Sequence, residues 1–260
     1  MQKKRNLIVA NWKMSPTSPA EAKKLFYSTR KSVALLKNTD VVICPPAVFL
    51  ENLAKLSGPK NLSFGAQNIF SERKGAFTGE ISAEMAKNVG AKYVIVGHSE
   101  RRSTLFGLAE TDKVINQKML LSFDSGLLPI LCVGERERDK DASYLSFIKE
   151  QLRSGLADVQ KKDLVGVIIA YEPLWAIGKS YKESMSPTDI HEMSLFIKKS
   201  IGEIYGRDIG QSAQVLYGGS VEKENAEAIV RYGEVRGFLV GHASLSASEF
   251  AEILKVGDIK

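Results

Sequence analysis

Cysteine, histidine and tryptophan are scarce in this chain of 260 residues, with two, three and two copies. Cys44 and Cys132 lie far apart and each falls at the end of an apolar run, so we expect neither a disulfide framework nor a zinc site. Long hydrophobic runs are also missing: residues 7–10 are too short for a signal-peptide core, and no stretch reaches the roughly 20 residues of a membrane-spanning helix. We therefore expect a reduced, cytoplasmic protein without membrane contact.

Charge of one sign is in small excess, with 36 Lys and Arg against 30 Asp and Glu and a formal net charge of +6. The densest basic runs, residues 3–5 and 161–162, are short, and no basic tract carries interleaved aromatic residues. Nucleic-acid binding rests on this net charge alone and predicts salt-sensitive association. The pattern favours instead a positive field that steers a small anionic substrate.

The remaining composition, 44% hydrophobic and 25% charged, is typical of a globular protein with a large core. Apolar, β-branched runs alternate eight times with segments of helical periodicity, and no linker composition marks a boundary. This predicts one domain over residues 1–260, a (β/α)8 TIM barrel with a parallel eight-stranded barrel. A doubly wound open sheet would use the same elements, but the eightfold count favours closure. The expected strands span residues 7–10, 41–44, 62–66, 93–96, 128–133, 165–170, 213–216 and 238–240. The expected helices span residues 20–36, 47–56, 83–87, 111–121, 142–156, 187–204, 223–230 and 246–254.

Two of the expected helices begin with a serine followed by a proline. Ser18 precedes Pro19, and Ser186 precedes Pro187. A hydroxyl can cap the first free N–H groups of a helix, and proline is favoured at the first helical position. Both pairs therefore predict a helix start.

An acid follows directly after the sixth expected strand. Residues 165–170 lack polar alternation, which indicates a strand buried on both faces, so Glu172 would emerge at its carboxyl end. Barrels keep their ligands at that edge. Pro173 stiffens the start of the following loop, and Trp175 would shield the carboxylate from water. Glu172 is thus the main candidate for a general base; the alternative is a solvated carboxylate at a strand end.

Three more polar groups follow other strands: Asn11 and Lys13 after the first, and His98 after the fourth. Each could instead have a purely structural role: Asn11 as a turn residue, Lys13 as an exposed cation, and His98 as a satisfied polar residue at a helix start. In a closed barrel, however, all three share one face with Glu172. A base, an imidazole, a cation and an amide in one pocket match what proton abstraction beside a carbonyl requires.

Glycines follow the last two strands, at Gly218, Gly219 and Gly241. They let backbone N–H groups approach an anion, which is how barrels commonly bind phosphate. The alternative is that they form tight turns only.

Four segments together resemble the triosephosphate isomerase family. They are Asn11-Trp12-Lys13, Gly97-His98-Ser99-Glu100-Arg101-Arg102, Ala170 to Gly178 and Tyr217-Gly218-Gly219-Ser220. The resemblance continues in family order through Gly65 to Asn68, Ala76 to Glu80, Cys132 to Glu135 and Gly237 to Gly241. It runs almost from end to end of the chain. It implies an aldose–ketose isomerase that interconverts dihydroxyacetone phosphate and D-glyceraldehyde 3-phosphate through an enediolate, in glycolysis and gluconeogenesis.

The resemblance also implies roles for individual residues. Glu172 would carry the proton between the two carbons, and His98 would polarise the carbonyl as a neutral imidazole, since a helix N-terminus disfavours a second positive charge. Lys13 would stabilise the developing negative charge, with Asn11 and Glu100 setting the geometry. No metal or organic cofactor is implied.

A second set of implied residues binds the phosphate group and excludes water. Backbone amides of Gly178, Ser220, Gly241 and His242 would hold the phosphate of the small phosphorylated triose. Residues 176–178 would form the tip of a lid that protects the enediolate. The loop containing Thr78 would project into a partner subunit, which implies a homodimer.

Two departures from the family pattern bear on the expected site. Eight residues, Lys179 to Ser186, precede Pro187 where the family usually has six, so we expect altered lid kinetics. His242 replaces a usual glycine, so either the local backbone has shifted or the imidazole adds a donor of its own. We favour an unchanged backbone path at positive φ, because histidine adopts the left-handed region more readily than bulky branched residues. These departures leave open a catalytically silent barrel that binds phosphate compounds or a protein partner. The presence of Asn11, Lys13, His98 and Glu172 argues against that alternative.

Overall fold

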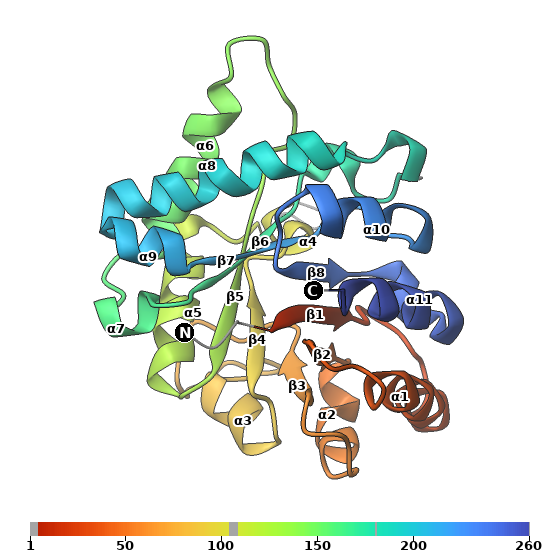
Figure 1. Cartoon of the computed structure of the whole chain (residues 1–260). Helices are drawn as coiled ribbons and strands as arrows, with labels where there is room; N and C mark the ends of the chain where they lie inside the picture. The colour runs from red at the N-terminus through yellow and green to blue at the C-terminus, as the bar shows by residue number, and fades with distance from the viewer. Residues whose placement is uncertain (1–4, 104–108, 180, 260) are drawn as a thin grey trace.

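The computed structural model describes residues 5–103, 109–179 and 181–259, in which eight parallel strands form a closed barrel surrounded by helices (Figure 1). The strands pair in chain order and β1 pairs with β8, so the sheet has no free edge. The predicted (β/α)8 barrel is confirmed. The strands are β1 (Asn6–Asn11), β2 (Thr39–Cys44), β3 (Leu62–Ala66), β4 (Tyr93–Val96), β5 (Leu128–Val133), β6 (Ile168–Tyr171), β7 (Gln214–Tyr217) and β8 (Gly237–Val240).

Helices follow the strands along the described chain. The α-helices are α1 (Pro19–Val33), α2 (Ala47–Ala54), α3 (Ala83–Asn88), α4 (Ser99–Arg102), α5 (Asp112–Asp124), α6 (Ser143–Gly155), α7 (Lys161–Leu164), α8 (Pro187–Tyr205), α9 (Arg207–Ser212), α10 (Lys223–Tyr232) and α11 (Ala247–Gly257). The short 3-10 helices are η1 (Leu174–Ala176), η2 (Tyr181–Glu183) and η3 (His242–Leu245). No helix in the described part of the chain is long and apolar enough to cross a membrane.

Strand side chains divide between two apolar cores. In β1, Leu7 and Val9 belong to a core that gathers residues from inside the barrel, whereas Ile8 and Ala10 join the larger core between barrel and helices. Successive side chains of a strand point to opposite faces, and here both faces are dry. This is why the strand sequences are continuous apolar runs without polar alternation.

Both predicted serine caps form. Ser18 Oγ accepts a hydrogen bond from Glu21 N at the start of α1, and Ser186 Oγ accepts one from Asp189 N at the start of α8. Proline occupies the first turn of each helix. The local signals in the sequence therefore set these two helix starts.

The sixth strand begins later than predicted. Residues 161–164 form the short helix α7, Val165 is 65% exposed, and Gly166 has a φ of 78°, so β6 starts only at Ile168. The expected start at residue 165 is wrong because a four-residue helix followed by a glycine turn carries no periodic signal. The strand still ends directly before Glu172, as predicted.

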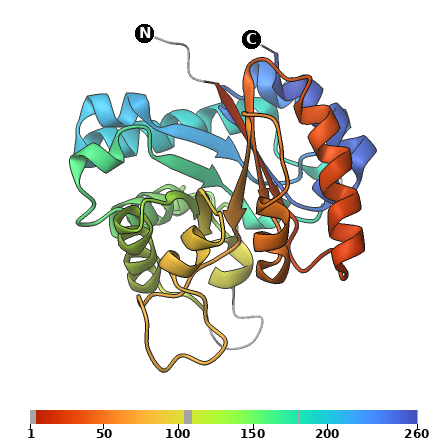
Figure 2. The ribbon, with the colours of Figure 1, turned by 90° about the horizontal axis from the view of Figure 1, so that it is seen from below.

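One loop departs from the barrel surface. Residues 67–82 connect β3 to α3, and the middle of this loop extends away from the body of the molecule, in gold in Figure 2. Every residue from 72 to 80 is exposed. Thr78 lies in this projecting part.

Candidate active site

The carboxyl ends of the strands surround a cavity of about 520 Å³. Its walls contain all the predicted site residues except Glu100: Asn11, Lys13, His98, Glu172, Gly178, Ser220, Gly241 and His242. The side chains at its base are buried, since Asn11 is 5%, His98 7% and Glu172 2% exposed. Polar groups from β1, β4, β6, β7 and β8 thus converge on one pocket, as the closed barrel predicts.

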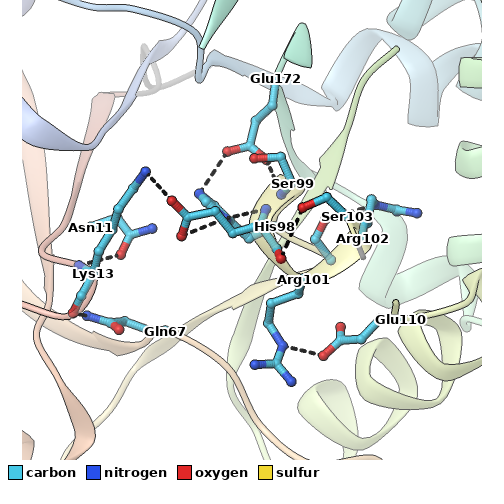
Figure 3. Close-up of polar contacts among 12 residues, drawn as sticks. Asn11, Lys13, Gln67, His98, Ser99, Arg101, Arg102, Ser103, Glu110 and Glu172 are labelled. Carbon is cyan, nitrogen blue, oxygen red and sulfur yellow. Dashed lines mark hydrogen bonds and ion pairs between the residues drawn. The ribbon is translucent and has the colours of Figure 1, made fainter. Parts of the chain in front are cut away.

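The carboxylate of Glu172 contacts the β4–α4 junction with both oxygens (Figure 3). Oε1 lies 3.2 Å from His98 Nε2, and Oε2 accepts a hydrogen bond of 2.9 Å from the backbone N–H of Ser99. The main chain of Glu172 is fixed too, because its N–H donates to Val133 O on the neighbouring strand. The acid is therefore held beside the imidazole, and no Lys or Arg of the described residues pairs with it.

Hydrogen bonds define the tautomer of His98. The backbone N–H of Glu100 donates to Nδ1 over 3.2 Å, which requires a lone pair on that nitrogen. The neutral ring then carries its proton on Nε2, the atom that faces Glu172 and the cavity. His98 is thus oriented as a hydrogen-bond donor toward the pocket.

Lys13 reaches the pocket from an unusual backbone conformation. Its φ is 51°, uncommon for a residue with a side chain. Two contacts hold it: Lys13 N donates to Asn11 Oδ1 at 3.0 Å, and Gln67 Nε2 donates to Lys13 O at 2.8 Å and to Cys44 O at 2.9 Å. Asn11 and Gln67 therefore fix the main chain from which the lysine side chain extends.

Glu100 stands beside the pocket and pairs with Lys13. The Nζ–Oε1 distance is 2.7 Å, and Oε2 lies 3.7 Å from His98 Nδ1. Burial acts to raise the pKa of Glu100, but the hydrogen bond from Lys13 and the positive charge of Lys13 lower that pKa below its ordinary value. Glu100 therefore stays ionised and holds the lysine side chain.

Two glycines at the strand ends leave room for these side chains. A Cβ at Gly218 would lie 2.8 Å from Glu172 Cγ, and one at Gly241 would lie 3.3 Å from Lys13 Cε and 3.7 Å from its Nζ. The main chain after β7 thus packs against the acid, and the main chain after β8 packs against the cation. A larger residue at either position would displace a pocket group.

His242 does not occupy the conformation expected for it. It begins η3, and among the described non-glycine residues only Lys13, Ala142, Asp158 and Glu234 have positive φ. The expectation of a positive φ is wrong, because the chain turns at Gly241 and enters a helical turn at residue 242. The imidazole of His242 is exposed at the pocket wall.

The segment after Glu172 arches from β6 toward the loop after β7. It forms η1 and then Ile177 and Gly178, whose φ is 74°. Ser220 Oγ contacts this segment twice, at Ala176 O (3.0 Å) and Lys179 O (2.8 Å). Within the stretch from Lys179 to Ser186, Ser180 lies outside the described residues.

A polar cluster beneath this segment was not predicted. Glu135, 1% exposed, accepts from Tyr171 Oη (2.9 Å), Trp175 Nε1 (2.9 Å) and Arg138 Nε (3.1 Å). The indole N–H of Trp175 is thus directed at Glu135. The signal existed, because Glu135 follows a buried strand just as Glu172 does. Gln67, which binds the main chain of Lys13, and the Ser99 N–H, which binds Glu172, were not predicted either. Their contacts involve backbone atoms, and the type of a residue does not show where its backbone lies.

Both cysteines are free and buried, and burial raises the pKa of each thiol. Among the residues that the structure describes, no group of three or more His, Cys, Asp or Glu side chains is arranged to hold a metal ion.

Fold and site together define a barrel enzyme that combines an acid, an imidazole and an ammonium group at its strand ends. The family model for triosephosphate isomerase matches residues 6–257. The chain is 40% identical to the triosephosphate isomerase of Caldanaerobacter subterraneus subsp. tengcongensis, over 96% of this chain and 99% of the relative. It is 41% identical to that of Thermoanaerobacter sp. (strain X514), again over 96% and 99%.

The crystal structure of triosephosphate isomerase from Bartonella henselae superposes with a TM-score of 0.82 at 34% identity, covering 97% of this chain and 98% of the other. The chain belongs to the triosephosphate isomerase family. These enzymes are aldose–ketose isomerases that interconvert dihydroxyacetone phosphate and D-glyceraldehyde 3-phosphate in glycolysis.

Proposed function

We propose that Glu172 is the general base that carries the proton between the two carbons of the triose phosphate. The observation that supports this most directly is its position: it is a buried carboxylate at the cavity base, 3.2 Å from an imidazole. Within the part of the chain that the structure describes, no Lys or Arg pairs with it. A base must lie within hydrogen-bond reach of the proton that it removes. Glu172 can reach a substrate in this cavity by giving up its contact with His98.

His98 polarises the substrate carbonyl as a neutral donor. Its Nε2–H faces the cavity because Nδ1 is occupied by the N–H of Glu100. When Glu172 removes the proton from one carbon, negative charge moves to the carbonyl oxygen, and this donor stabilises the enediolate. Return of the proton to the neighbouring carbon completes the isomerisation.

Lys13 supplies the positive charge in the pocket. Its Nζ lies between Glu100 and the backbone at Gly241, so it can contact both the enediolate oxygen and the phosphate of the substrate. Asn11 acts by fixing the main chain of Lys13, and Glu100 by holding its ammonium. A positioned cation is worth more in a water-poor site than in solution.

The phosphate group is held by main-chain N–H groups of the loops after β6, β7 and β8. Gly178, Ser220, Gly241 and His242 line the same cavity as Lys13, and glycines there allow close approach. Residues 176–178 close over the substrate as a lid, which excludes water from the enediolate. The chemistry needs no cofactor, because the substrate carbonyl accepts the electrons.

A coupled assay of glyceraldehyde 3-phosphate isomerisation, with Glu172→Gln beside the wild type, tests both reaction and base. We expect the variant to lose activity while its circular dichroism spectrum and melting temperature stay close to those of the wild type. Glu137→Gln, an exposed carboxylate on the loop before α6, is the matched control. A folded wild type that binds inorganic phosphate but does not isomerise would favour a phosphate-binding barrel.

The proposed setting is the cytoplasm, where the same reaction serves glycolysis and gluconeogenesis. We also propose a homodimer built around the projecting loop. Thr78 and Phe77 are exposed at its tip, and Met14, beside Lys13, is 93% exposed. A second copy of this chain would cover Met14 with its own loop and so enclose the base of the site. Sedimentation of the active protein at the mass of a monomer would contradict the dimer.

A further inference from the structure

We propose that Arg138 is a positioning residue that connects the two ends of the lid segment and thereby controls its closure. The inference rests on the lid function proposed above. The lid segment comprises residues 173–179 and 181–186, and its ends are represented by Trp175 and Met185.

Arg138 contacts a side chain at each end of the lid segment. Its Cζ lies 5.5 Å from the ring centroid of Trp175, and its Nη2 lies 3.8 Å from Met185 Sδ. Met185 is buried, at 3% exposure, although it belongs to the lengthened part of the segment. One guanidinium group therefore touches both ends of the lid, which are separated in the sequence by the phosphate-binding tip.

The same guanidinium is fixed to the barrel from below. Nε donates to Glu135 Oε1 over 3.1 Å, and Nη2 donates to Tyr171 Oη over 3.2 Å. The ring of Tyr144 at the start of α6 lies 5.0 Å away on another side. Glu135 and Tyr171 come from the ends of β5 and β6, so the anchor of Arg138 belongs to the rigid barrel.

The chemistry of this site requires arginine in particular. A planar guanidinium can donate in its plane to Glu135 and Tyr171 while its faces pack against aromatic rings. Burial opposes the charge, but the hydrogen bonds with Tyr171 and Glu135 outweigh it and raise the pKa of Arg138. Lysine would keep the positive charge for Glu135 and lose the simultaneous contacts with Trp175 and Met185.

Movement of the lid must disturb this cluster. Trp175 Nε1 and Arg138 Nε both donate to the same oxygen, Oε1 of Glu135. A displacement of Trp175 therefore changes the contacts of Arg138 with Glu135 and with the indole ring. Because Arg138 also contacts Met185, its own displacement moves the other end of the lid segment. The two ends of the lid are thereby expected to move together.

Loss of this connection has a chemical consequence. If one end of the lid closes without the other, water can enter the pocket, and the C–O bond that carries the phosphate can rotate into the orientation that favours its cleavage. The C–O bond to phosphate then breaks, the electron pair leaves with the phosphate, and the remaining enol becomes 2-oxopropanal. The ratio of inorganic phosphate released to triose isomerised therefore reports on closure in a way that general destabilisation does not.

The test compares Arg138→Met and Arg138→Lys with Arg136→Met, a control at an exposed arginine on the same loop. We expect both Arg138 variants to raise the phosphate-release ratio several-fold and to lower kcat, with Arg136→Met unchanged. An unchanged ratio in folded Arg138→Met overturns the proposal. If that variant does not fold, the double variant Arg138→Met with Glu135→Gln is compared with Glu135→Gln alone, since Glu135 also accepts from Trp175. Equal phosphate-release ratios in these two proteins then overturn the proposal.

A second readout separates this proposal from the proposed function. Tryptophan emission is measured while inorganic phosphate is added to the wild type and to the Arg138 variants. The emission of the same proteins with Trp175→Phe is subtracted, so that the difference reports on Trp175. We expect the phosphate-dependent change in Trp175 emission to shrink in both variants. A wild type that isomerises, but whose Arg138 variants keep the ratio and the emission change, overturns the role of Arg138. A wild type that does not isomerise, while the emission responses still differ, overturns the proposed function alone.

Discussion

Glu172 and His98 contact each other directly, with Oε1 of the carboxylate 3.2 Å from Nε2 of the imidazole. The carboxylate that would accept the substrate proton thus contacts His98 Nε2–H, the donor that would polarise the substrate carbonyl. In the proposed mechanism, a substrate separates the two groups, and each then contacts a different atom of the substrate. The mechanism therefore predicts that neither group alone is sufficient for catalysis.

Replacement of His98 by Asn is expected to lower kcat about 10²- to 10⁴-fold, the usual contribution of a positioned acid–base group. The amide is shorter than the ring and does not place a donor at the position of Nε2. Steady-state kinetics with both substrates measures the loss. His191→Asn on α8 is the matched control, and a similar loss there would mean that the effect is not specific to the site.

Gly218→Ala should displace the base without changing its chemistry. The added methyl group would lie 2.8 Å from Glu172 Cγ, closer than side-chain carbons normally approach. We expect a lower kcat with little change in melting temperature, since the carboxylate can move into the cavity. Gly202→Ala on α8, where the nearest atom is 3.7 Å away, serves as the control. Full activity in Gly218→Ala would show that the position of Glu172 is less constrained than proposed.

The pair between Glu100 and Lys13 predicts a pH dependence of stability. The folded pKa of Glu100 lies below its ordinary value of 4.5, so the unfolded chain takes up the proton first as the pH falls. The stabilisation is fully present above the unfolded pKa and is lost as the pH falls through the folded pKa. Melting temperatures of the wild type and Glu100→Gln should therefore differ near neutrality and converge in acid. A difference that is constant with pH would exclude this linkage.

Much of the fold could be predicted because it depends on local patterns. Strands buried on both faces appear as apolar runs, and the serine caps at Ser18 and Ser186 mark helix starts. The start of β6 could not be predicted, because Val165 is apolar but exposed on a turn. Composition alone does not distinguish an apolar residue in a turn from one in a strand.

The site divides in a similar way. Glu172, His98 and Lys13 were predicted because chemically reactive residues after strands share one face of a barrel. The positive φ of Lys13, the donation from Gln67 and the cluster at Glu135 depend on contacts between distant segments. His242 shows the limit most clearly, since its expected φ followed from the family pattern and not from this chain's own turn.

His242 provides a test of whether its side chain adds to the phosphate site. The imidazole is exposed at the cavity wall, and its main-chain N–H is available whatever the side chain is. If the ring donates to phosphate, His242→Gly should raise KM and the inhibition constant of inorganic phosphate, and His242→Gln should restore part of the loss. If KM and the inhibition constant are equal in all three proteins, from mildly acidic to mildly alkaline buffer, the side chain of His242 has no role in phosphate binding.

The lengthened segment before Pro187 contacts the loop after β7 through Asn225 and Ser220. Asn225 Nδ2 donates to Ser184 Oγ over 3.2 Å and to Ser220 O over 2.9 Å, and Ser220 Oγ donates to Lys179 O. Ser184 thus gives the lengthened segment a fixed contact. Without such a contact, a longer segment would lose more conformational entropy on closure. A net hydrogen bond is worth about 0.5–1.5 kcal/mol, so we expect Ser184→Ala to change kcat or KM by roughly 2- to 10-fold.

The comparison that decides this point uses a chain in which residues 179–186 are replaced by a segment two residues shorter. Because the shorter segment needs no contact with Asn225, Asn225→Ala should impair the natural chain more than the shortened one. Kinetics and phosphate release measure both, with Ser28→Ala on α1 as a control for loss of a hydroxyl. Equal effects of Asn225→Ala in the two chains would mean that Asn225 supports only the loop at Ser220.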